Sequence, residues 1–262
     1  MHPLRWIGRK LAHHLSEPRA SAHASTSHPD LLAATLRKGD VLLIEGTSRF
    51  AAAIRYITQS TWSHAALCIG AGEASAMYDG PLLLIEADIN DGVRAIPLDG
   101  YVRLHTRICR PVGLSAAEID ALVAYATARL GNQYDLRNIV DLARYLIHPP
   151  PVPDRYRRRL LAFASGEPTR AICSSLIAAA FESIHYPVLP DIEIARSKGA
   201  LGKEQVREIL HIRDSRLYAP RDFDVSPFFL IVKPTLHSGF DPHALTWASV
   251  AIQEQRDGPS AR

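Results

Sequence analysis

The sequence predicts an α+β protein in which an antiparallel sheet packs on helices. Two short apolar segments, 82–87 and 93–97, flank a turn at Asn90-Asp91-Gly92, which is the pattern of a β-meander. A helix is predicted from the capping box of segment 115–118 to a glycine stop at Gly131. Another apolar helix begins near Cys173.

Other segments complete the predicted order of elements. Strands are expected at 41–44, 61–70, 106–110 and 226–232, and helices after a cap at Thr47 or Ser48 and over 136–147. The stretch 190–217 reads as mixed loop and short helix, and 242–253 could form a helix. We predict three regions: an N-terminal amphipathic segment and linker (1–30), one large folded domain (31–237) and a C-terminal tail (238–262).

Composition restricts the class of protein. The chain has 262 residues, 47% of them hydrophobic, which is enough for a sizeable core. A formal net charge of +3 is too small to indicate a nucleic-acid partner. Three cysteines (Cys68, Cys109 and Cys173) do not suggest a disulfide framework and suit a reducing compartment. No cofactor is indicated, and the histidine spacing matches no metal site.

The N-terminus is basic and amphipathic. It contains no apolar run typical of a signal peptide, and no stretch of about 18 apolar residues occurs in the chain. Leu4, Ile7, Leu11 and Leu15 share one helical face. The sequence therefore predicts a cytoplasmic protein, with peripheral membrane contact through residues 4–15 as an open alternative.

Cys173 is the candidate nucleophile. Small and polar residues precede it, and an apolar helix follows, so its thiol is expected at a helix N-terminus. Unpaired N–H groups and the positive end of the helix dipole there favour the thiolate. Cys68 and Cys109 lie within apolar strands and read as buried, inert thiols.

His64 is the candidate general base, because it opens a strand after Trp62 and Ser63, where an imidazole can face a cleft. A catalytic imidazole usually needs a third group that fixes its orientation. Glu86 is the leading candidate, being an acid within an apolar strand. Asp88 and Asn90 are alternatives for the same role.

Together these stretches resemble the YiiX-like branch of the NlpC-type papain-fold hydrolases, the permuted papain-like amidases. The resemblance spans roughly 36–234, with His64 before Cys173, which is the permuted order. It is carried by Lys38-Gly39-Asp40-Val41-Leu42-Leu43, Trp62-Ser63-His64-Ala65-Ala66-Leu67-Cys68-Ile69-Gly70, Ile85-Glu86-Ala87, Gly92-Val93, Leu130-Gly131-Asn132-Gln133-Tyr134-Asp135 and Cys173-Ser174-Ser175-Leu176-Ile177.

The resemblance implies a papain-like, circularly permuted fold with a small antiparallel sheet or open barrel packed on helices. It implies a thiol hydrolase with Cys173 as nucleophile, His64 as general base and Glu86 orienting His64. Tyr134 would lie by the cleft and bind substrate or the oxyanion. Ser175 stands where many relatives have a glutamate, so a substrate contact made by that acid is in doubt.

Three functions remain open from the sequence. The first is an amidase or peptidase acting on a peptide, a peptidoglycan fragment or a lipid amide. The second is a lipid-directed thiol acyltransferase or esterase, which the amphipathic start and the basic run Arg155–Arg159 favour. The third is a catalytically degenerate papain-like binding module.

Overall fold

The structure is a computed structural model. It describes residues 25, 27–71, 82–88, 91–132, 172–198, 204–211, 215, 218–237 and 239–245. Within these ranges, no helix combines the length and the apolar character needed to cross a bilayer.

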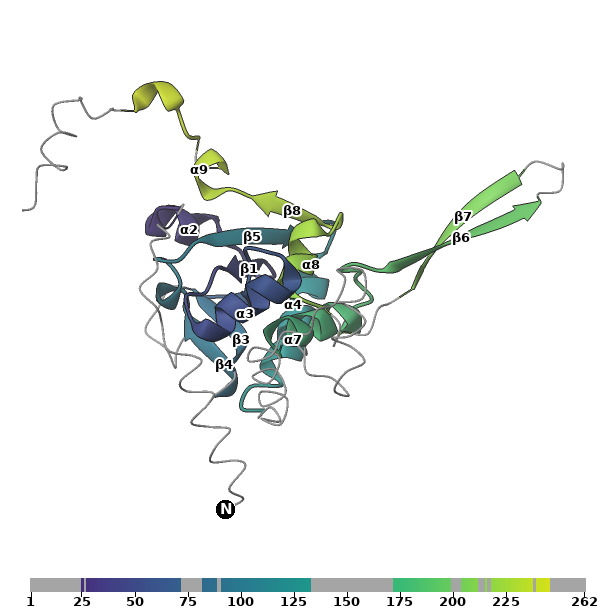
Figure 1. Cartoon of the computed structure of the whole chain (residues 1–262), viewed down its shortest axis with the longest axis horizontal. Coiled ribbons are helices and arrows are strands. Elements are labelled where there is room, and N and C mark those ends of the chain that lie inside the picture. Colours follow the sequence, from purple (N-terminus) through teal and green to yellow (C-terminus); the bar gives the residue numbers. More distant parts are fainter. Residues whose placement is uncertain are drawn as a thin grey trace, which may run out of the picture.

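A six-stranded antiparallel sheet forms the centre of the molecule (Figure 1). Its strands are neighbours in the order β4-β3-β2-β1-β5-β8. Their bounds are Val41–Ile44 (β1), His64–Gly70 (β2), Leu83–Asp88 (β3), Gly92–Pro97 (β4), Thr106–Pro111 (β5) and Phe229–Val232 (β8). The sheet is open rather than a closed barrel, because β4 and β8 do not pair with each other. The predicted mixture of helices and antiparallel sheet is confirmed.

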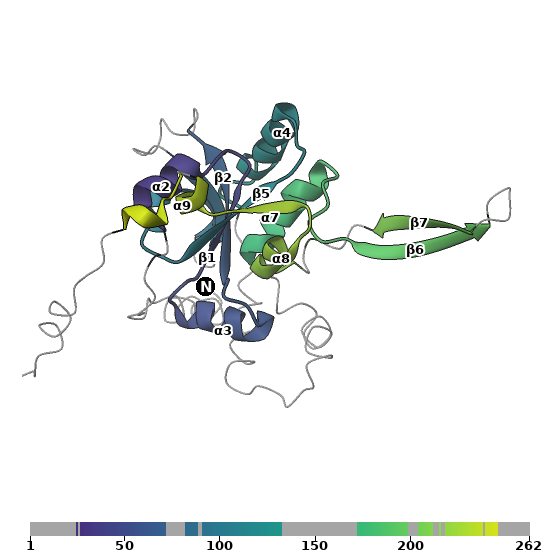
Figure 2. The same ribbon diagram turned by 90° about the horizontal axis from the view of Figure 1, so that it is seen from above.

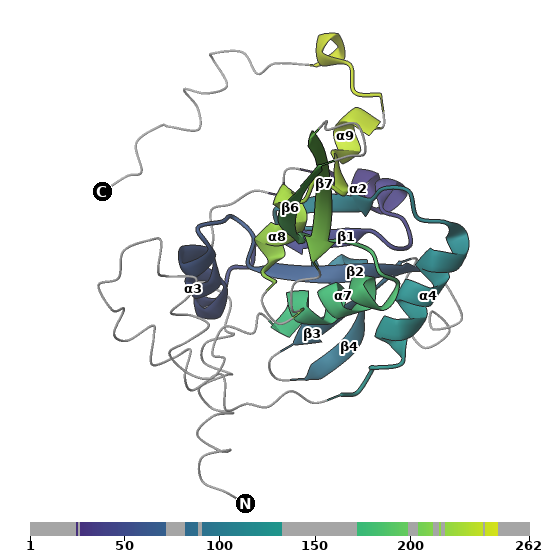
Figure 3. The ribbon, with the colours of Figure 1, turned by 90° about the vertical axis from the view of Figure 1, so that its right-hand side faces the viewer.

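Helices cover both faces and one end of this sheet. Their bounds are Pro29–Thr35 (α2), Arg49–Thr58 (α3), Ala116–Thr127 (α4), Ile172–Ser183 (α7), Pro220–Val225 (α8) and Pro234–His237 (α9), with short 3-10 turns at Leu98–Gly100 (η2) and Pro242–Ala244 (η4). Figure 2 shows α4 and α7 on one side of the sheet, and α2 and α9 on the other. Figure 3 shows α7 lying across β2 and β3.

Strand periodicity divides the core into two layers. Alternate residues of the central strands, such as Leu43 and Leu67, pack with the buried faces of α4 and α7. Their neighbours Leu42 and Ala66 pack instead against Leu32 of α2. Both faces of β1 are therefore buried, which explains the uninterrupted apolar run of this strand.

The local signals in the sequence explain most element boundaries. Ser48 caps α3 by accepting a hydrogen bond from the Ala51 N–H. The predicted capping box between Ser115 and Glu118 is present at the start of α4. This helix ends at Thr127, earlier than predicted, and only turns lead on to Gly131. The helix predicted over 136–147 lies outside the described residues.

The prediction for 190–217 was wrong. Strands β6 (Asp191–Lys198) and β7 (Glu204–His211) pair antiparallel as a separate two-stranded sheet. Figures 1 and 2 show this hairpin extending away from the body. In sequence, polar and apolar residues alternate over only four positions of β6 (191–194) and not along β7, so the strand signal was too short to be recognised. In the C-terminal stretch 242–253, the described part forms only η4.

A buried ion pair ties the turn before β1 to β5. Both oxygens of Asp40 accept hydrogen bonds from Arg110, at 2.8 Å from Nε and 2.7 Å from Nη2. The Asp40 side chain is 2% exposed and that of Arg110 is 17% exposed. Bidentate geometry of this kind is the strongest form of a carboxylate–guanidinium contact. The Gly-Asp turn thus has a structural role in this protein.

We expect Arg110→Met to lower the free energy of unfolding by about 3–5 kcal/mol, because it leaves the Asp40 carboxylate buried without its cation. Urea denaturation measures the change. The matched control is Asp120→Asn, which removes the exposed Lys38–Asp120 pair and should cost less than about 1 kcal/mol. Equal effects of the two substitutions would contradict the structural role of Asp40.

Candidate functional site

Cys173 lies in the first turn of α7, as its sequence context predicts. Cys173 is only 4% exposed, so the surrounding residues enclose its thiol. The next residue anchors the helix, since the Ser174 hydroxyl donates to the Tyr218 carbonyl at 2.7 Å. The backbone N–H groups of Ser174 and Ala65 both hydrogen-bond to the Cys173 sulfur.

The Ala65 N–H is available because β2 and β3 separate at this end. The Cys68 N–H donates to Asp40 next to β1, so alternation directs the odd-numbered N–H groups of β2 toward β3. The paired register of β2 with β3 begins only at Leu67 and Ile85. Beyond that pair, the sulfur of Cys173 takes the place of a strand carbonyl as the acceptor for Ala65.

His64 begins β2 and hydrogen-bonds to Cys173. Its side chain is 22% exposed, whereas the thiol beside it is buried. The Nε2 atom of His64 is engaged by Glu86, which leaves Nδ1 for the sulfur. A cysteine and a histidine that are 109 positions apart in sequence thus meet across α7 and β2.

The two groups shift each other's titration in opposite directions. Burial raises the pKa of the Cys173 thiol, but the charge and hydrogen bond of His64 and the two backbone N–H groups outweigh it, so the pKa is lowered. Burial likewise opposes protonation of His64, but Cys173 and then Glu86 raise its pKa to about 10. The favoured state is therefore a thiolate–imidazolium pair.

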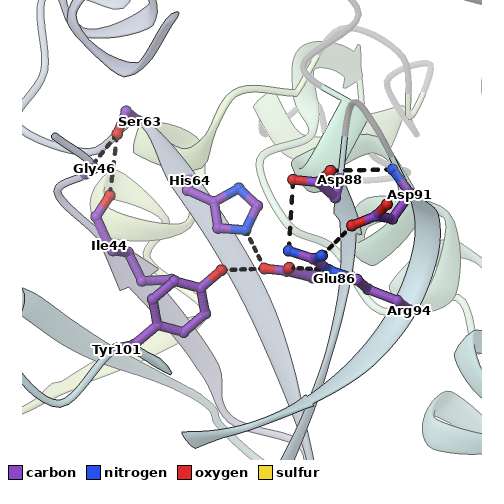
Figure 4. Close-up of polar contacts among 9 residues, drawn as sticks. All are labelled: Ile44, Gly46, Ser63, His64, Glu86, Asp88, Asp91, Arg94 and Tyr101. Carbon is purple, nitrogen blue, oxygen red and sulfur yellow. Dashed lines mark hydrogen bonds and ion pairs between the residues drawn. The ribbon is translucent and has the colours of Figure 1, made fainter. Parts of the chain in front are cut away.

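Glu86 lies behind His64 on β3. Ala65 and Ala87 both face the core layer of α4 and α7, so His64 and Glu86 leave their strands on the same side of the sheet. The Glu86 side chain is 1% exposed, and its Oε2 atom lies 2.6 Å from His64 Nε2 (Figure 4). This contact fixes the tautomer and plane of the imidazole.

Two residues that the sequence did not single out also hold Glu86. Arg94 donates from Nε to Glu86 Oε1 at 2.8 Å, and the Tyr101 hydroxyl donates to Oε2 (Figure 4). Burial opposes ionisation of Glu86, but His64, Tyr101 and Arg94 overcome it and lower the pKa of Glu86 to about 2. Arg94 is opposite Glu86 in the β3–β4 register, a signal that the meander pattern contained.

The alternatives to Glu86 do not occupy this position. Asp88 lies 3.6 Å from Arg94 Nη2, and Figure 4 shows the His64 ring joined to Glu86, with Asp88 joined to Arg94. Asn90 lies outside the described residues, as do Tyr134, the basic run 155–159 and the predicted N-terminal helix. Among the residues described, no three His, Cys, Asp or Glu side chains gather as a metal site.

The residues before His64 are fixed in place. Ser63 Oγ accepts from the Gly46 N–H at 2.8 Å and lies 3.4 Å from the Ile44 carbonyl, as Figure 4 shows. A Cβ at Gly46 would lie only 3.0 Å from Ser63 Oγ, so a larger residue would displace this contact. Trp62 Nε1 donates to Asp224 of α8 at 3.0 Å. The start of β2 is therefore positioned by two independent contacts.

The other two cysteines have the opposite character. Cys68 and Cys109 are both buried in strands, and neither forms a disulfide. Burial raises the pKa of Cys68 to about 12 and also raises that of Cys109. Neither has a histidine among the groups that influence it. Only Cys173, of the three cysteines, has its thiolate favoured.

Comparison with known proteins found one matching family and a similar solved structure. Residues 35–145 match the family described as permuted papain-like amidase enzyme, YaeF/YiiX, C92 family. His64 and Glu86 lie within the matched residues, and Cys173 lies beyond them. A crystal structure of metalloprotein yiiX from Escherichia coli O157:H7 is 16% identical, with a TM-score of 0.44, covering 75% of this chain and 96% of that one. No curated protein matches this chain.

We expect Cys173→Ala to lower the pKa of His64, because it removes the charge and hydrogen bond that most strongly oppose the effect of burial. Side-chain NMR titration of His64 measures the shift, which should be at least about one pKa unit. Cys109→Ala, at another buried cysteine, should leave the titration unchanged. An unaltered His64 pKa in Cys173→Ala would show that the two groups do not interact in solution.

Proposed function

Because residues 35–145 carry the pattern of the permuted papain-like amidases, we propose that this protein is a thiol hydrolase that cleaves an amide or peptide bond. The observation that carries the proposal is the Cys173–His64 pair, with Glu86 bonded to the far side of the imidazole at 2.6 Å. A nucleophile, a base and an orienting group within contact of one another form the constellation required for covalent acyl transfer.

The reaction begins from the thiolate–imidazolium pair. The Cys173 sulfur attacks the carbonyl carbon, and the carbonyl oxygen takes the negative charge. Collapse of this intermediate breaks the C–N bond, while His64 donates its proton to the departing amine. A thioester with Cys173 remains. His64, now neutral, accepts a proton from water as the water attacks the thioester. The C–S bond then breaks, the carboxylic acid product leaves, and the thiolate–imidazolium pair is regenerated.

The N-terminus of α7 supplies donors for the oxyanion. The positive end of the helix dipole lies at this terminus and favours negative charge there. In this mechanism the backbone N–H of Cys173 stabilises the oxyanion, and Tyr134 is a second donor proposed from the resemblance. Loss of one such donor typically slows acyl transfer by about 10²–10³.

The substrate that we propose is a peptide, a peptidoglycan fragment or a lipid amide, and we expect no nucleic-acid partner. A lipid-directed acyltransferase remains the competing proposal. The features that favour it, the N-terminal segment 4–15 and the basic run 155–159, lie outside the described residues. Co-sedimentation with anionic liposomes, with and without residues 1–30, tests the proposed peripheral contact with a membrane.

We expect iodoacetamide at pH 7 to alkylate Cys173 well before Cys68 and Cys109, because only its pKa is lowered. Peptide mass spectrometry over a time course measures the three rates in the folded protein. His64→Ala should remove most of the selectivity, since it deletes the imidazolium. Equal, slow labelling of all three cysteines would favour the binding-module alternative.

We expect Cys173→Ala to abolish hydrolysis of any amide substrate found by library screening, while the fold persists. Cys68→Ala is the matched control and should retain turnover, since this thiol is inert in the proposed mechanism. Circular dichroism confirms that both variants are folded. Turnover by Cys173→Ala at the parental rate would exclude Cys173 as the nucleophile.

A further inference from the structure

The carboxylate of Glu86 has more hydrogen-bond partners than a simple Cys–His–Glu arrangement requires. Its Oε1 atom accepts from Arg94, and its Oε2 atom accepts from both His64 and Tyr101. The last of these puts a neutral hydroxyl and the catalytic imidazole on the same oxygen atom. Because Tyr101 already occupies one lone pair of this oxygen, the His64 N–H can donate to it from only a narrow range of directions.

Tyr101 approaches this oxygen from a rigid part of the chain. It follows η2, and its N–H donates to the Leu98 carbonyl at 2.9 Å, while its own carbonyl accepts from the Leu104 N–H at 2.9 Å. Leu98 is 2% exposed and belongs to the core layer beside α2. The phenol is thus attached to the core through a fixed backbone turn.

The Tyr101 ring also limits the movement of His64 directly. The two ring centroids lie 5.9 Å apart, with the planes inclined at 50°. His64 therefore meets Tyr101 twice, through ring contact and through the oxygen that both engage. Burial, followed by the charge of Glu86, raises the pKa of Tyr101, so the phenol remains a hydrogen-bond donor throughout the range in which enzymes operate.

We propose that Tyr101 is a positioning residue for His64: together with Arg94 it locks the Glu86 carboxylate in the rotamer that accepts the imidazole N–H. Arg94 holds one oxygen and Tyr101 fixes the other, so Glu86 cannot rotate away from His64. This inference rests on the proposed thiol hydrolase function, but it concerns an interaction that is measurable without a substrate.

Tyr101→Phe provides the test, because it deletes one hydroxyl and changes no formal charge. If Tyr101 positions Glu86, the His64–Glu86 hydrogen bond weakens and the pKa of His64 falls, by about one unit for partial loss of a charge-assisted bond. If Tyr101 only withdraws charge from Glu86, its loss makes the carboxylate a stronger acceptor and the pKa of His64 rises. NMR titration of the His64 ring distinguishes the two signs.

The matched control is Tyr186→Phe. Its hydroxyl also makes several hydrogen bonds, to Val112 and to the Phe228 carbonyl, and its ring packs on Phe181. It is therefore expected to affect stability without moving the His64 titration. The rate of Cys173 alkylation, measured against pH, gives a parallel test. In Tyr101→Phe the rise in this rate should move to higher pH, because a less ordered imidazolium stabilises the thiolate less well.

The outcomes separate the two proposals. A rise in the His64 pKa, or no change in Tyr101→Phe, would overturn the positioning role and leave the thiol hydrolase proposal intact. Absence of selective Cys173 alkylation in the parent protein would refute the hydrolase proposal, whatever the His64 titration shows. Should Tyr101→Phe unfold, Tyr101→Met, which also lacks the hydroxyl donor, provides a second variant, with the same fall in the His64 pKa expected.

Discussion

A buried, ionised carboxylate is the constraint on which the site depends. Glu86 stands in the middle of an otherwise apolar strand, where an unpaired charge would be very costly. Three donors from three separate segments, His64 on β2, Arg94 on β4 and Tyr101 after η2, make it tolerable. Each donor also loses its own freedom of movement. The contacts that stabilise the buried Glu86 carboxylate therefore also orient the His64 imidazole. The oriented imidazole in turn stabilises the thiolate of Cys173.

The sheet order explains how distant residues reach this carboxylate. The β-meander places β2, β3 and β4 side by side, so three neighbouring strands can each contribute one polar side chain at the same level. Helix α7 then crosses β2 and β3 and brings its first turn to the point where these strands part. That parting releases a main-chain donor, the Ala65 N–H, for the sulfur. The gap in the strand pairing is thus part of the site.

Local patterns were sufficient to predict the meander, the capping box of α4, and the helix start at Cys173, since each depends on a few adjacent residues. They also indicated Cys173, His64 and Glu86 as candidates. Arg94 was not singled out, although the register of the predicted meander places it opposite Glu86. Tyr101 could not be selected in this way, because a tyrosine near a turn is ordinary in a surface position and its contact with Glu86 arises only from packing in the folded protein. The β6–β7 hairpin was missed because apolar alternation covers only residues 191–194 of β6 and is absent from β7, although the two strands pair along their whole length.

The hairpin leaves and rejoins the body at points that are fastened to each other. The Tyr218 hydroxyl donates to the Leu189 carbonyl at 3.4 Å, and Ser226 Oγ donates to the Val188 carbonyl. The segments before β6 and after β7 are therefore held together by contacts within the domain, and not by contacts within the hairpin. Because these contacts hold the two ends of the β6–β7 hairpin together, the hairpin can change in length at little entropic cost to the rest of the fold. The hairpin could therefore vary in sequence and length without disturbing the site. The hydrogen bond from Ser174 to Tyr218, next to the end of the hairpin, would still hold the helix that carries Cys173.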